Sequence, residues 1–133
     1  MKRETEDVRR QKLFLMLNLN HKKLDTWKEG IKFVTFIYKI TEKFPKSELY
    51  GLTNQMRRAA VSIPSNISEG ASRNSAIERR RFYEISRFSL VELDTQIEIA
   101  IRLKYISEET IPELNEKINH LFALLSNLIK NTI

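Results

Sequence analysis

Apolar residues recur at alternating spacings of three and four through four long segments of this 133-residue chain. This spacing places them on one face of an α-helix. Breaks containing proline, glycine and serine separate the segments, and period-two alternation and hairpin dipeptides such as Asn-Gly are absent, so no segment favours a β-strand. Four helices joined by short connections predict an all-α, antiparallel up-down four-helix bundle.

The breaks define four predicted helices, at about residues 26–44, 47–69, 76–106 and from 107 or 110 onward. The first and third open with capping boxes, Thr26-x-x-Glu29 and Ser75-x-x-Glu78, in which the first side chain accepts a backbone N–H of the first turn. Ser47 is the predicted N-cap of the second helix.

Pro64 lies inside the second predicted helix and is expected to kink or interrupt it. Its missing N–H leaves carbonyl groups one turn earlier in need of partners, which Ser62, Ser65 and Asn66 are placed to supply. Gly70 then provides the permissive backbone expected at a helix end.

The first and third helices carry more apolar residues than one core face needs. On the first helix the predicted core stripe is Leu24, Trp27, Ile31, Val34 and Tyr38. A second stripe beside it contains Phe33, Phe36 or Ile37, Ile40 and Phe44. Either the extra residues widen the core and scatter over the surface, or they form a self-association surface. The candidate interface residues are Phe36, Ile40, Phe88 and Ile99.

The chain is basic, with a formal net charge of +6, and its charge is unevenly distributed. Residues 1–23 hold seven basic and three acidic side chains, so we assign them to a basic N-terminal extension ahead of a bundle domain at residues 24–133. The start lacks the order of a signal peptide, and the longest late charge-free stretch, residues 118–129, is short of the roughly 20 residues that span a bilayer. We expect a cytoplasmic protein without a membrane partner.

Arginines cluster at the start of the third helix. The members are Arg73, Arg79, Arg80, Arg81 and Arg87. They form either a solvated face paired with Glu78 and Glu84 or a patch that contacts phosphates. Apart from Phe82 and Tyr83 no aromatic side chain is interleaved with them, so phosphate contacts rather than base stacking are predicted. The extension adds Lys2, Arg3, Arg9, Arg10 and Lys12.

Polar side chains of the second and third helices are predicted to form a network that fixes helix register. Its members are Gln55, Arg57, Arg58, Asn66, Glu69 and Glu92. A catalytic carboxylate pair is the alternative, but no histidine, metal cluster or nucleophile accompanies it. The two histidines, His21 and His120, and the absence of cysteine predict no metal site. Three isolated glycines offer no phosphate loop, so no cofactor and no enzyme activity are expected.

The run from Gln55 to Gly70, QMRRAAVSIPSNISEG, resembles the signature of the four-helix-bundle family named after proteins encoded in intervening sequences of bacterial 23S rRNA genes. The resemblance covers nearly everything after His21. It implies a bundle that assembles into a ring-shaped homo-oligomer, usually a pentamer, with no assigned catalytic residues and a proposed role in binding nucleic acid. Phe88 is a departure, because family members commonly have glycine there, and it bears on helix packing or subunit contacts.

Taken together, these features predict a non-enzymatic, oligomeric helical-bundle protein that binds RNA or DNA through basic surface residues. The alternative is a structural scaffold whose ring binds a partner protein, with the basic N-terminal arm as the docking tail.

Overall fold

The computed structural model describes residues 16–132, and the basic residues of the extension from Lys2 to Lys12 lie outside this part of the chain. The four long helices are α2 (Asp25–Glu42), α3 (Leu52–Ala71), α4 (Ala76–Arg102) and α5 (Ile111–Asn131). Short 3₁₀ turns precede or connect them at η1 (Asn20–Lys23), η2 (Lys46–Glu48) and η3 (Glu108–Thr110). Residues 16–132 contain no strand, which confirms the all-α prediction.

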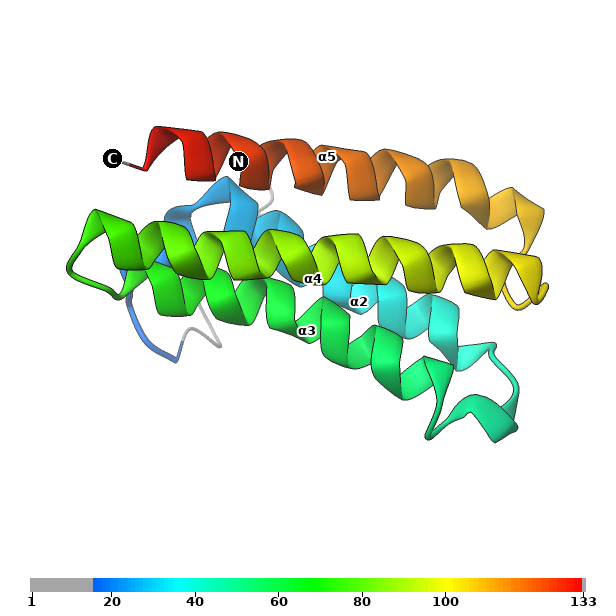
Figure 1. Cartoon of the computed structure of the whole chain (residues 1–133). Helices are drawn as coiled ribbons and strands as arrows, with labels where there is room; N and C mark the ends of the chain where they lie inside the picture. Colours follow the sequence, from blue (N-terminus) through cyan, green and yellow to red (C-terminus); the bar gives the residue numbers. More distant parts are fainter. Residues whose placement is uncertain (1–15, 133) are drawn as a thin grey trace, which may run out of the picture.

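Each long helix packs against two others around a common interior. Helix α3 contacts α2 and α4, and α5 contacts α4 and α2. Helices α2 and α4 run in one direction, and α3 and α5 run in the other (Figure 1). The η2 connection and the α4–α5 connection therefore lie at one end of the molecule, and the α3–α4 turn lies at the other. This is the predicted antiparallel up-down order.

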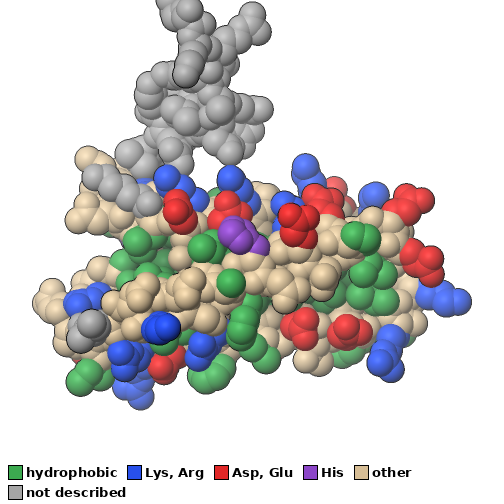
Figure 2. Space-filling view, turned by 90° about the horizontal axis from the view of Figure 1, so that it is seen from above, with side chains coloured by type: hydrophobic (Ala, Val, Ile, Leu, Met, Phe, Trp, Pro, Cys, Tyr) green, Lys and Arg blue, Asp and Glu red, His purple; other side chains and the backbone are tan. Residues whose placement is uncertain are grey.

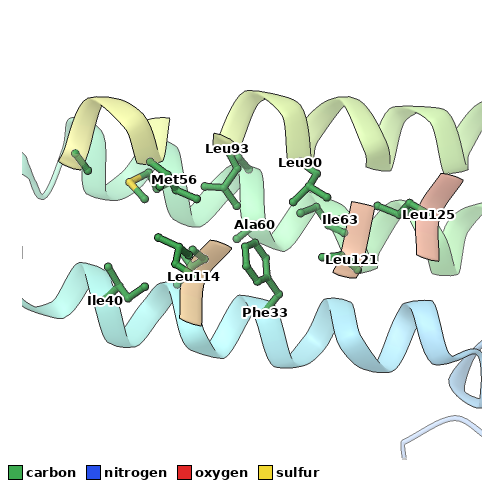
Figure 3. Close-up of a cluster of buried hydrophobic side chains, with 14 of the residues drawn as sticks. Phe33, Ile40, Met56, Ala60, Ile63, Leu90, Leu93, Leu114, Leu121 and Leu125 are labelled. Carbon is green, nitrogen blue, oxygen red and sulfur yellow. The ribbon is translucent and has the colours of Figure 1, made fainter. Parts of the chain in front are cut away.

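The core consists of aliphatic and aromatic side chains from all four helices. Phe33, Ala60, Leu90 and Leu121, one from each helix, point into the same interior (Figure 3). Burying one large apolar side chain contributes roughly 1.5 to 3 kcal/mol, so this layer is a main source of stability.

The core stripe of α2 differs from the prediction. The buried residues are Phe33, Ile37, Ile40 and Phe44, which belong to the predicted second stripe. Ile31 and Tyr38 of the predicted core stripe are each 40% exposed. Both stripes have the same helical spacing, so spacing alone does not choose between them. Burying the observed stripe encloses two phenylalanines, and it leaves the Tyr38 ring at the surface. Ile40 was therefore wrong as an interface residue.

A predicted side-chain cap forms only at α4 among the described helices, where the Ser75 hydroxyl accepts the Glu78 N–H at 3.1 Å. Helix α2 begins at Asp25 without a side-chain cap, so the Thr26 capping box was wrong. Ser47 lies in η2 and does not cap α3. That helix starts five residues later, because the η2 turn brings the Glu48 carboxylate to the Leu52 N–H at 3.3 Å.

Helix α3 runs without interruption through Pro64, so the predicted break is absent. The proline is buried against α2, where an added Cβ on Gly30 would lie 3.5 Å from the Pro64 Cβ. Gly70 also departs from the prediction: its φ is not positive, and the helix continues to Ala71. It is needed for packing, because an added Cβ would lie 2.9 Å from side-chain atoms of Phe82 and Tyr83.

Small polar side chains join α3 to α4. The Ser62 and Ser89 hydroxyls are 2.8 Å apart and share a hydrogen bond. The buried Ser86 hydroxyl donates to the Ile63 carbonyl at 2.8 Å. Within α3, the Asn66 amide donates to the Ser62 hydroxyl at 2.9 Å and so supports the contact of Ser62 with Ser89. These contacts set the position of α4, and with it the arginines at its start.

Candidate nucleic-acid interface

The arginine cluster lies at the end of the bundle where α3 turns into α4. In Figure 2, Lys and Arg side chains gather at the left end of the face that is shown, and Asp and Glu are more frequent toward the right. Helix α4 starts after the Ser75 cap and packs against α5. Because successive residues of an α-helix are rotated by about 100°, the three consecutive arginines from Arg79 to Arg81 point in different directions around its first turns.

Two of the predicted phosphate ligands hold the α3–α4 turn. Arg73 pairs with Glu69 one turn earlier, with Nη2 2.6 Å from the carboxylate Oε1, and its guanidinium lies over the Phe82 ring at 4.8 Å. Arg79 is half-buried and donates to the carbonyls of Arg73 at 3.2 Å and Asn74 at 2.9 Å. Arg79 therefore closes the turn.

Two further arginines point toward α5. Arg80 and Arg87 are two helical turns apart and therefore share a face of α4. Arg80 donates to the Thr132 carbonyl at 2.6 Å. Arg87 donates to the Ser126 hydroxyl at 3.3 Å and lies 5.9 Å from the centre of the Phe122 ring. Arg81 is exposed on another face of α4, so the five arginines are spread over the α3–α4 turn and the first half of α4 rather than forming one patch.

Most of this positive charge has no carboxylate partner. Among residues 16–132, Arg73 is the one member of the cluster with a carboxylate within 4.0 Å. The alternative pairing with Glu78 and Glu84 is not formed within that distance in this part of the chain. The four remaining guanidinium groups, together with the positive end of the α4 dipole, make this end of the bundle electropositive.

The predicted polar network between α3 and α4 does not assemble. Gln55 and Arg58 are exposed, Glu69 pairs with Arg73, and Glu92 accepts from Gln96 at 3.2 Å. Arg73 follows Glu69 by four residues, whereas Arg57 and Arg58 lie twelve and eleven residues before it in α3, so Glu69 pairs with the nearer arginine. Serine hydroxyls fill the α3–α4 contact in place of the network.

Arg57 bonds to α2 instead, at a place that the prediction did not single out. Its Nε donates to the Thr41 hydroxyl at 2.9 Å, and its guanidinium lies over the Tyr38 ring at 4.5 Å. Both Arg57 and Tyr38 line an open groove of about 640 Å³ that also includes Tyr50 and Arg58. The sequence signal for this groove is the adjacent pair Arg57-Arg58, with Tyr50 seven residues before Arg57. The sequence prediction missed the groove because it places Tyr38 in the core.

An outward apolar stripe remains on α4. Phe88 is 66% exposed and Ile99 is 45% exposed, and Ile77 and Val91 lie on the same side of the helix. Phe36, the fourth candidate, is half-buried against the core. Two of the four predicted interface residues are therefore available at the surface of the chain.

Tyrosines at both ends of α4 have perturbed acidity. The Tyr105 hydroxyl donates to the Glu48 carboxylate at 3.0 Å, and this bond, with burial and the charge of Glu48, raises the pKa of Tyr105. It ties η2 to the α4–α5 connection. Burial raises the pKa of Tyr83, and the Arg79 cation acts against that rise. Neither tyrosine lies beside a cluster with metal-binding composition, since residues 16–132 contain no such group of His, Asp and Glu.

None of the helices between residues 16 and 132 has the length and hydrophobicity needed to cross a bilayer.

Comparison with known proteins identifies similar chains. A family model described as 23S rRNA-intervening sequence protein matches residues 22–127. A solved structure of a protein with unknown function from the S23 ribosomal protein family, from Bacteroides thetaiotaomicron, superposes with a TM-score of 0.73 at 21% identity and covers 80% of this chain and 96% of that chain. At that identity the likeness concerns the fold. No curated protein matches this chain.

Proposed function

The chain belongs to the 23S rRNA-intervening sequence protein family, and from this premise we propose that it is a non-enzymatic protein that binds nucleic acid through arginines at the start of α4. One observation carries the proposal: four guanidinium groups in the first half of α4 have no carboxylate within 4.0 Å among the described residues. Uncompensated cations attract phosphates, which supply the dominant sequence-independent part of binding.

Arg80, Arg81 and Arg87 are the residues suited to hold phosphates. A guanidinium has five N–H donors, and Arg80 and Arg87 each use one of theirs on a neutral oxygen of Thr132 or Ser126. The planar fork of arginine also matches the oxygens of a phosphate. Arg79 is excluded from this set because its donors close the α3–α4 turn.

We also propose that the protein is a homo-oligomer that assembles through the outward stripe of α4. The family resemblance favours a pentameric ring. Exposed Phe88 and Ile99 support assembly through this stripe, because neighbouring large apolar side chains on a surface are typical of protein interfaces. A ring would repeat the arginine cluster once per subunit and so increase the affinity for one nucleic-acid chain.

The test is a triple variant, Arg80→Gln, Arg81→Gln and Arg87→Gln, in a fluorescence anisotropy titration with duplex DNA over a range of salt concentrations. Affinity should fall, and the slope of log affinity against log salt should become shallower by about 0.9 for each phosphate that the protein no longer neutralises. The matched control replaces Lys39, Lys43 and Lys46 at the opposite end of the bundle with glutamine, which removes the same charge. It should bind within about twofold of the original protein, because those lysines lie outside the arginine cluster.

An equal fall in affinity for the two triple variants would show that net charge alone, and not this cluster, causes binding. If the intact protein binds no nucleic acid at low salt, the arginines are a solvated surface, and a structural scaffold whose ring binds a partner protein, with the basic N-terminal arm as the docking tail, becomes the better account.

A further inference from the structure

We propose that the groove between α2 and α3 is a second, separate site, which binds single-stranded nucleic acid by stacking a base and holding the adjacent phosphate. The inference takes its class of ligand, nucleic acid, from the proposed function, but it rests on a different set of residues. The groove lies at the end of the bundle that carries η2 and the start of α3 (Figure 1). Arg73, Arg79 and Arg80 lie toward the opposite end of α3, a helix of 20 residues that is about 30 Å long. Arg87 is level with the far edge of the groove, since the neighbouring Ser86 and Ser89 bond to Ile63 and Ser62, but its side chain faces α5.

The groove has the size and composition of a ligand site. Its volume of about 640 Å³ lies within the range of roughly 300 to 1,000 Å³ for small-molecule pockets. Two tyrosines, two arginines and an asparagine contribute to its lining, and no acidic residue does. The nearest carboxylate in the sequence, that of Glu48, is held by the Leu52 N–H and the Tyr105 hydroxyl instead.

Tyr38 and Arg57 form a cation–π pair on one side of the groove. The Arg57 guanidinium lies 4.5 Å from the centre of the Tyr38 ring, and its Nε donates to the Thr41 hydroxyl, which in turn donates to the Ile37 carbonyl at 2.8 Å. A base stacks on an arginine plane as it does on an aromatic ring. Because Arg57 is already immobilised, stacking on it costs little side-chain entropy.

Tyr50 supplies a free aromatic surface on the same groove. Its side chain is 92% exposed, an unusual environment for a large ring that contributes nothing to the core. A tyrosine at the surface can stack a base at small cost in conformational freedom, because it has only two side-chain torsions. Stacking on such a ring is worth about 1 to 3 kcal/mol per base.

Arg58 and Asn54 provide the polar contacts. Arg58 is exposed and has no carboxylate within 4.0 Å among residues 16–132, so its guanidinium is available to a phosphate. Asn54 is exposed one turn earlier on α3, and an amide both donates to and accepts from base edges. Bases in a duplex are stacked on one another and do not reach such a groove, whereas unpaired bases do. The combination therefore selects a single strand.

The test measures binding of the full chain to a fluorescein-labelled ten-nucleotide oligouridine and to an RNA duplex of the same length. Tyr50→Ala should weaken oligouridine binding about 5-fold to 150-fold, the equivalent of one base stacked on one ring, and leave duplex binding unchanged. Tyr50→Phe keeps the ring and should restore the affinity. Arg58→Gln should weaken oligouridine binding and make its salt dependence shallower by about 0.7.

The matched control is Arg102→Gln, which removes an exposed cation at the same end of the bundle but outside the groove. Its oligouridine affinity should remain within about twofold of the original protein. All substituted side chains are exposed, so circular dichroism melts should coincide with that of the original protein.

Unchanged oligouridine binding by Tyr50→Ala and Arg58→Gln, with weaker binding by the triple variant of Arg80, Arg81 and Arg87, would overturn the groove and leave the proposed function standing. A decaglutamate peptide that displaces oligouridine at equal concentration, with no effect of Tyr50→Ala on either ligand, would assign the groove to an acidic protein segment and also overturn the inference. Absence of all nucleic-acid binding at low salt would remove both proposals.

Discussion

The two glycines inside the helices illustrate how single residues set the distances between elements. Gly30 of α2 faces Pro64, and an added Cβ would meet it at an ordinary contact distance of 3.5 Å. Gly70 of α3 faces α4, and an added Cβ would lie 2.9 Å from side-chain atoms of Phe82 and Tyr83 and 3.1 Å from the Arg79 carbonyl oxygen. The same residue type is therefore optional at one position and required at the other.

Substituting each glycine with alanine should change stability in opposite directions. Gly70→Ala should lower the free energy of unfolding by about 1 to 3 kcal/mol through overpacking, more than the roughly 1 kcal/mol that alanine gains from helix propensity. Gly30→Ala should leave stability unchanged or raise it by up to about 1 kcal/mol. Urea unfolding followed by circular dichroism measures both. Equal urea midpoints for the two variants would mean that α3 and α4 move apart at Gly70 without loss of stability, which would contradict the overpacking argument.

At the scale of the element, α4 shows how a helix ends without glycine. The Tyr105 N–H donates to the Ala100 carbonyl and the Lys104 N–H to the Ile101 carbonyl, both at 2.9 Å, the pattern of a Schellman motif. Lys104 occupies the left-handed position with a φ of 63°. The motif turns the chain so that Tyr105 reaches Phe44, with ring centres 5.3 Å apart, and Glu48.

Lys104→Gly should therefore stabilise the protein. A side chain in the left-handed region costs about 1 to 2 kcal/mol, and glycine avoids most of that cost, so we expect a gain of about 1 kcal/mol and a rise in melting temperature of about 3 to 6 °C. Lys104→Ala is the control, because it removes the charge but keeps the strained Cβ. A melting temperature for the glycine variant no higher than that of the alanine variant would contradict the backbone argument.

At the scale of the whole molecule, the described part of the chain has two surfaces that its own core does not use: the outward apolar stripe of α4 and the arginine-rich end of the bundle. Phe88 belongs to the first. It is 66% exposed, so it is not part of the core of the subunit. Assembly and folding can therefore be tested independently.

Phe88→Asp should dissociate the proposed oligomer without unfolding the subunit. A charge buried in a subunit interface costs several kcal/mol unless it is paired, whereas the same charge on the surface of a monomer is solvated. Light scattering on the eluting peak measures the mass, and circular dichroism measures the helix content. Ile31→Asp, at an apolar position of α2 that is 40% exposed, is the control and should leave the mass unchanged. A monomeric original protein at micromolar concentration would overturn the assembly itself.

The presence and order of the four helices followed from the sequence alone, as did the absence of strands between residues 16 and 132 and the Ser75 cap. These features depend on local physics: the 3.6-residue period, the residues that break it, and a hydroxyl within reach of an N–H three residues ahead.

Tertiary structure alone decided which apolar stripe of α2 faces inward and that Tyr38 and Arg57 meet beside Tyr50. Each depends on the rotation of a helix about its own axis. That rotation is set by the packing of all four helices together, because turning one helix changes the burial of every residue along it. A pattern within a single helix does not contain this information, and the candidate groove between α2 and α3 could be found only from the packed bundle.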